Sequence, residues 1–242
     1  MITPGTFIMS KDEIKLADYS LAQELWNAIS HGLGALFGVA ALVLCILKMN
    51  NSSSTYTGLD YFAISFYCAS IIICMTISCV YHSLAKNSGK KVLRVIDHST
   101  IYFLIAGSYA PFSLILMKDV PLWGISNFPS AGIVIICLCY ALIILGAVFT
   151  AINFEKFNLL SQLMYAIGGS IVLIDPVTFL KALSINTLGL VSFIVGSVLY
   201  FVGLAFYNVG KKKSLWWHTV FHFFILCGIL GHFLSIYFSV II

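Results

Sequence analysis

The chain alternates between long apolar stretches and short polar connections along almost its whole length. Seven stretches are apolar for about the 20 residues that a helix needs to cross a bilayer. They cover residues 28–47, 59–82, 95–117, 130–150, 159–180, 187–208 and 215–240. Backbone polar groups in lipid must be paired within the chain, so stretches of this kind predict helices. We therefore predict an all-α, polytopic integral membrane protein, a bundle of seven transmembrane helices.

The composition indicates that lipid is part of the solvent of this chain. Of its 242 residues, 60% are hydrophobic and only 9% are charged, whereas a soluble domain averages about a quarter charged residues. We predict two parts, an N-terminal cytoplasmic or interfacial arm over residues 1–27 and the seven-helix domain over residues 28–242. The expected location is the cell membrane, which the chain crosses several times.

The distribution of positive charge predicts the orientation in the membrane. The net charge of +4 is modest, and no basic stripe with interleaved aromatic residues suggests nucleic acid as a partner. Ten of the 13 Lys and Arg residues fall on the side of the N-terminus: Lys11, Lys15, Lys86, Lys90, Lys91, Arg94, Lys156, Lys211, Lys212 and Lys213. Only Lys48, Lys118 and Lys181 fall on the other side. Since positive loops stay inside, the N-terminus is predicted to be cytoplasmic.

Histidines gather at the same predicted end of the bundle and suggest a metal site. His218 and His222 are four residues apart, which places both rings on one helix face. His82, at the end of the second stretch, offers a third imidazole. Three histidines with an open fourth position are typical of catalytic zinc sites. Asp97 is a candidate general base or water-holding residue, and Ser78 lies one helical turn before His82.

Each of these residues also has an ordinary explanation when it is taken alone. A pair of interfacial histidines, a histidine at a helix end, or an aspartate near a helix N-terminus is common without any metal. Ionisable groups that converge on one face of one membrane favour function over chance. Glu24, Asn27 and His31 share one face of a helix entering the first stretch, where they are expected to support the site or to be a solvated helix start.

The same residues belong to patterns that resemble the bacterial haemolysin III family. That family is similar to the progestin and adipoQ receptors, which include the adiponectin receptors. The patterns are Glu24-x-x-Asn27-x-x-x-His31-Gly32-x-Gly34, Ser78-x-x-x-His82, Asp97-His98-Ser99-Thr100-Ile101-Tyr102, Ala106-Gly107-Ser108-Tyr109-Ala110-Pro111 and His218-x-x-x-His222. One departure is Gln23-Glu24, where many relatives have an acidic pair.

The resemblance implies seven helices, a cytoplasmic N-terminus and an intramembrane zinc ion. By this resemblance His82, His218 and His222 are the zinc ligands and Asp97 holds the zinc-bound water. It also implies kinship with membrane hydrolases that cleave amides in the manner of ceramidases. Fold alone does not establish such an activity.

Three functions remain open from the sequence. The first is a zinc-dependent hydrolase of lipid amides or esters, with a membrane lipid as substrate. The second is a receptor-like or membrane-homeostasis protein in which zinc is structural. The third is a pore-forming cytolysin, which the polar residues disfavour because they gather at one end. The sequence does not define the oligomeric state.

Overall fold

The protein is an all-helical bundle in the computed structural model, which describes residues 13–210 and 213–242. Six of its helical segments are long and apolar enough to cross a membrane within this described part: Leu21–Asn51, Gly58–Ser83, Ser88–Leu116, Ala131–Ile152, Thr187–Asn208 and Trp216–Val240. No strand is assigned in the same residues. The predicted all-α, polytopic membrane architecture is confirmed, and residues 1–12 of the predicted arm lie outside the described part.

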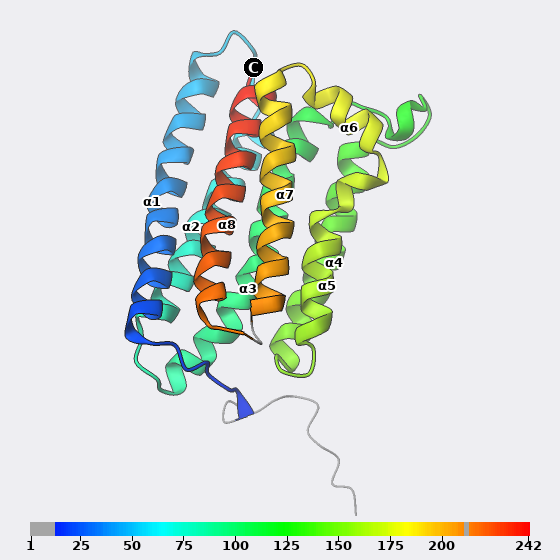
Figure 1. The fold of residues 1–242 in the computed structure, drawn as a ribbon. Helices are drawn as coiled ribbons and strands as arrows, with labels where there is room; N and C mark the ends of the chain where they lie inside the picture. Colours follow the sequence, from blue (N-terminus) through cyan, green and yellow to red (C-terminus); the bar gives the residue numbers. More distant parts are fainter. Residues whose placement is uncertain (1–12, 211–212) are drawn as a thin grey trace, which may run out of the picture.

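The helices follow the predicted order along the chain. In sequence they are α1 (Leu21–Asn51), α2 (Gly58–Ser83), α3 (Ser88–Pro111), η2 (Phe112–Leu116), η3 (Leu122–Gly124), α4 (Ala131–Ile152), α5 (Asn158–Gly169), η4 (Ile171–Ile174), α6 (Pro176–Leu183), α7 (Thr187–Gly210), α8 (Trp216–Ser235) and η5 (Ile236–Val240). The start of α1 and the C-terminus lie at opposite ends of the bundle (Figure 1). We call the end where α1 and α8 begin the histidine end.

The fifth predicted stretch is not one continuous helix. It consists of α5, the short η4 and α6, which together run from the histidine end toward the opposite end (Figure 1). Pro176 explains the break, because proline lacks the N–H of a helical bond and fits the first turn of a new helix. The Asp175 carboxylate caps that turn by accepting a hydrogen bond from the Thr178 N–H at 3.2 Å. The count of seven spans and the cytoplasmic N-terminus stay predictions.

Helix α1 begins earlier than the sequence pattern indicates, at Leu21 in place of residue 28. Its start is a capping box: the Ser20 hydroxyl accepts from the Gln23 N–H, and the Gln23 side chain accepts from the Ser20 N–H. This arrangement pairs N–H groups that a helix start otherwise leaves free. As a result, Glu24, Asn27 and His31 all lie on α1, with Asn27 and His31 buried.

Close packing joins α8 to α7 and brings the histidine-bearing helices together. A Cβ atom built on Gly231 of α8 would come within 2.7 Å of the Gly196 Cα of α7. Small residues allow backbones to approach in this way where no hydrophobic effect drives helices together. Helix α8 also packs against α1, and α1 against α2. His82 of α2 and the first turns of α8 therefore face each other.

Candidate metal centre

Three histidines from two helices meet at the histidine end of the bundle. His82 is on the last turn of α2, and His218 and His222 are on the first turns of α8. Each offers one ring nitrogen, and these three nitrogens lie within 4.8 Å of one another. The Nε2 atoms of His218 and His222 are 3.0 Å apart. The three predicted ligands are thus brought together.

The ring of His82 is held by Glu24. The His82 Nδ1–H donates to the Glu24 Oε2 at 2.7 Å, while the Asn27 Nδ2 lies 3.5 Å from the same nitrogen. A proton on Nδ1 leaves a lone pair on Nε2. The His82 Nε2 is buried and has no hydrogen-bond partner among the described residues. A carboxylate that orients a histidine in this way is the usual support of a metal ligand.

Glu24 is in turn paired with a buried cation. The Lys90 Nζ contacts the Glu24 Oε1 at 2.5 Å and donates to the Leu84 carbonyl at 2.8 Å. The Lys90 side chain is only 2% exposed, so both charges are compensated away from bulk water, as buried charges must be. Lys90 was not predicted as a site residue, because nothing in its local sequence pattern separates it from the neighbouring lysines.

His31 supports the cluster from the side of α1. Its ring stacks on the His222 ring with centroids 3.7 Å apart and planes 6° apart. The predicted support residues Glu24, Asn27 and His31 therefore all contact the metal-site histidines. His31 is not one of the three residues whose ring nitrogens converge.

Asp97 and Ser78 lie beside the cluster, on α3 and α2. Ser78 is buried and lies near the Asp97 carboxylate. Both residues line the cavity that also exposes His218 and His222. A carboxylate next to three imidazoles is the arrangement needed to accept a proton from a water molecule near the metal.

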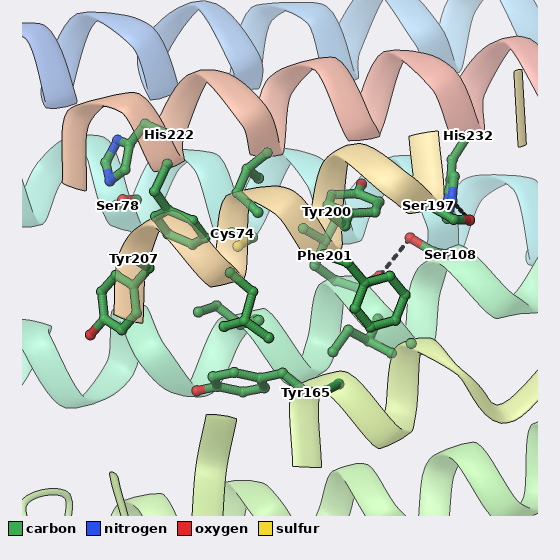
Figure 2. A pocket seen from close by; sticks show the side chains of 18 of the residues that line it. Cys74, Ser78, Ser108, Tyr165, Ser197, Tyr200, Phe201, Tyr207, His222 and His232 are labelled. Atoms are coloured by element: carbon green, nitrogen blue, oxygen red, sulfur yellow. Dashed lines mark hydrogen bonds between the residues drawn. The ribbon is translucent and has the colours of Figure 1, made fainter. Parts of the chain in front are cut away.

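An elongated, mostly apolar cavity of about 150 Å³ leads away from the histidines. Figure 2 shows His222 and Ser78 at one end of it and His232, Ser197 and Ser108 at the other. His218 and His232 are 14 residues apart on α8, about 21 Å at 1.5 Å per residue. One wall is formed by α5 and α7, where Phe201 lines the cavity and is 41% exposed. The cavity is thus not closed off by this side chain.

The residues present fit a transition-metal ion. Metal–imidazole distances of about 2.1 Å place tetrahedral ligand nitrogens about 3.4 Å apart. Three nitrogens within 4.8 Å need only small ring rotations to reach one ion. The buried, unpartnered Nε2 of His82 is costly unless something binds it.

The fold and the site together define a class of protein. It is an all-helical, polytopic membrane bundle with three histidines gathered at one end. The Haemolysin-III related family matches residues 19–233, and the chain belongs to this family. It is 31% identical over 220 residues to the "Hemolysin-3 homolog" of Bacillus subtilis (strain 168), covering 91% of this chain and 95% of that protein. It is 29% identical over 219 residues to "Hemolysin-3" of Bacillus cereus, covering 90% of this chain and 92% of that protein.

Proposed function

We propose that the protein is a zinc-dependent membrane hydrolase that cleaves an amide or ester bond of a lipid. The observation that carries the proposal is the position of the triple-histidine site. Its three ring nitrogens, with Asp97 beside them, lie at the end of an apolar cavity within the bundle. A site for water chemistry is thus joined to a space suited to a hydrocarbon chain.

His82, His218 and His222 would hold the zinc ion, with Glu24 fixing the plane and tautomer of the His82 ring. Bound zinc would polarise the scissile carbonyl and make water more acidic. Three protein ligands leave a fourth position open, as in catalytic sites; structural zinc sites have four protein ligands.

Asp97 would act as the general base. Its carboxylate accepts the proton of the attacking water, whose oxygen forms the new bond to the acyl carbon. The same proton can then pass to the departing amine or alcohol, so the reaction consumes one water and releases a carboxylic acid. The Ser78 hydroxyl, donating to Asp97, keeps the carboxylate aimed at the histidines.

The substrate would reach the cavity from the bilayer, between α5 and α7. Leu204 on α7 and Ala166 on α5 line the cavity and are partly exposed. Lateral access spares the acyl chain a passage through water.

The test is metal content by mass spectrometry of detergent-purified protein, beside His218→Ala and His222→Ala, followed by hydrolysis assays on acyl amides and esters. About one zinc per chain that both variants lose, with hydrolysis that Asp97→Asn abolishes, is the expected result. Zinc without hydrolysis of any acyl lipid would favour a structural metal in a receptor-like protein. Absence of metal from carefully prepared protein would refute the mechanism.

The name of the Bacillus cereus relative, "Hemolysin-3", favours membrane lysis as a second candidate. The test is release of haemoglobin from erythrocytes by the purified protein. Lysis that persists in His218→Ala and Asp97→Asn would separate this activity from the metal site.

A further inference from the structure

A second cavity, of about 190 Å³, adjoins the first at the histidine end. We call it the polar vestibule and define it by Tyr19, Tyr81, Arg94, Tyr207 and Ser214. His98, Tyr207 and His218 line both cavities. The two spaces are therefore neighbours beside the histidine cluster, one mostly apolar and the other lined by several hydroxyl groups.

Aromatic rings connect the vestibule to the metal-site histidines. The Tyr19 ring lies 5.2 Å from the His218 ring and 5.5 Å from the His82 ring, measured between centroids. The Tyr207 ring lies 5.7 Å from that of His218. A molecule with a polar and an apolar part could occupy both cavities and would place its junction beside the histidines.

The lining of the vestibule favours a group that accepts hydrogen bonds and carries negative charge. Among the described residues that line it, Arg94 is the only acidic or basic one apart from histidines. The Arg94 Nη1 donates to the Glu155 Oε1 at 2.7 Å and to the Lys15 carbonyl. These bonds involve one terminal nitrogen, whereas a guanidinium carries five N–H donors.

The phenols and Ser214 add neutral donors to the guanidinium. A phenol is protonated at neutral pH, so Tyr19, Tyr81 and Tyr207 each carry an O–H group that can donate. Arginine with several hydroxyl groups is a common way to bind a phosphate or carboxylate. A cationic head group would be repelled by Arg94 and would find no carboxylate among the lining residues.

We propose that the polar vestibule binds the phosphate-bearing head group of a single-chain acyl lipid, through Arg94 and the surrounding hydroxyls. The inference rests on the proposed function, because it places the acyl chain in the apolar cavity and the acyl linkage beside His218. It narrows the substrate class to anionic acyl lipids with a short head group.

The test compares the dissociation constants of two lipids that share one acyl chain. One is an acylglycerol phosphate and the other is the uncharged monoacylglycerol. Full-length, metal-loaded Asp97→Asn protein in detergent is used, so that neither lipid is consumed. We expect the phosphate lipid to bind about tenfold more tightly, the effect of about one charge-assisted hydrogen bond. Equal affinities would overturn the inference without any further variant.

Variants then test whether the preference for the phosphate lipid arises from the vestibule. Arg94→Gln is expected to abolish the preference for phosphate, and Tyr81→Phe to reduce it a few-fold. Glu155→Gln, which removes the competing carboxylate, should preserve or increase it. Lys86→Gln is the control for surface charge at the same end, since Lys86 is half-exposed and pairs with Asp18. A preference that Lys86→Gln removes and Arg94→Gln retains would refute the assignment.

A measurement with inorganic phosphate alone tests whether the vestibule binds a free anion or requires a lipid head group. We expect phosphate to stabilise the protein against heat far less than the phosphate lipid does. Equal stabilisation that depends on Arg94 would overturn the lipid part of the inference. Failure to find zinc or hydrolysis would refute the proposed function, whereas the binding comparison reports on the vestibule independently.

Discussion

Glu24 links the histidine cluster to a buried cation, because its two carboxylate oxygens contact two different partners. One oxygen accepts from the His82 Nδ1–H at 2.7 Å, and the other contacts the Lys90 Nζ at 2.5 Å. The first contact selects the tautomer that frees the His82 Nε2, and the second neutralises a buried ammonium. The Glu24 side chain therefore both orients the His82 ring and compensates the charge of Lys90.

Glu24→Gln is expected to lower metal affinity by about 10- to 100-fold, the usual effect of losing a carboxylate behind a ligand histidine. It also leaves the Lys90 ammonium buried without its counter-ion, which destabilises the fold. Adding Lys90→Met should restore thermal stability but not metal affinity. Asp18→Asn, which breaks an exposed pair with Lys86, is the control and should change neither quantity. Metal titration and thermal melting measure the two effects separately. Full metal affinity in Glu24→Gln would contradict the role assigned to this carboxylate.

Ser78→Ala is expected to lower kcat about tenfold while leaving the metal content unchanged, because in the proposed mechanism its hydroxyl orients Asp97 and is not a metal ligand. Ser83→Ala is the matched control on the same helix. Its hydroxyl donates to the Cys79 carbonyl at 2.8 Å and is exposed. Loss of metal in Ser78→Ala would instead identify this serine as part of the ligand set.

At the scale of the elements, the bundle differs from one made only of continuous helices, because the segment α5–η4–α6 is broken. Asp175 fixes the break: its carboxylate accepts from the Thr178 N–H at 3.2 Å and from the Trp123 N–H at 2.6 Å. The second bond ties α6 to the connection between α3 and α4. The break leaves α5 only 12 residues long, and α5 contributes a wall of the apolar cavity.

Asp175→Ala is expected to destabilise the protein by about 1–3 kcal/mol, because one helix cap and one further backbone hydrogen bond are lost. Metal content should not change, since α6 lies at the end opposite the histidines (Figure 1). The measurement is thermal unfolding in detergent, with the exposed Asp119→Ala as a control from the same end. Equal melting temperatures for the two variants would show that the cap contributes nothing.

Hydropathy was sufficient to predict the helices, and helical spacing was sufficient to predict that His218 and His222 lie close together. His218 and His222 share a face of any helix, so their meeting required no tertiary information. The break at Pro176 was missed because an apolar stretch looks the same whether or not its helix is continuous. The Glu24–Lys90 pair and the contacts of Tyr19 were missed because they depend on the rotation of α3 and on the path of residues 13–20, which hydropathy does not define.

For the whole molecule, the orientation in the membrane decides which compartment the vestibule faces. The vestibule lies at the histidine end, where α1 and α8 begin. Ten Lys and Arg residues were assigned to that end and three to the other. The positive-inside rule predicts that the histidine end faces the cytoplasm. Polar products would then be released inside the cell.

Site-specific labelling in intact cells tests this orientation directly. Single cysteines are introduced at Ala85, between α2 and α3, and at Ser53, between α1 and α2, both exposed, in a background whose seven cysteines are replaced. A membrane-impermeant maleimide is expected to label Ser53→Cys in intact cells and Ala85→Cys only after permeabilisation. Retained metal content shows that the cysteine-free background is folded. Labelling of Ala85→Cys in intact cells would reverse the orientation, and the site would then act on lipids whose polar products leave the cell.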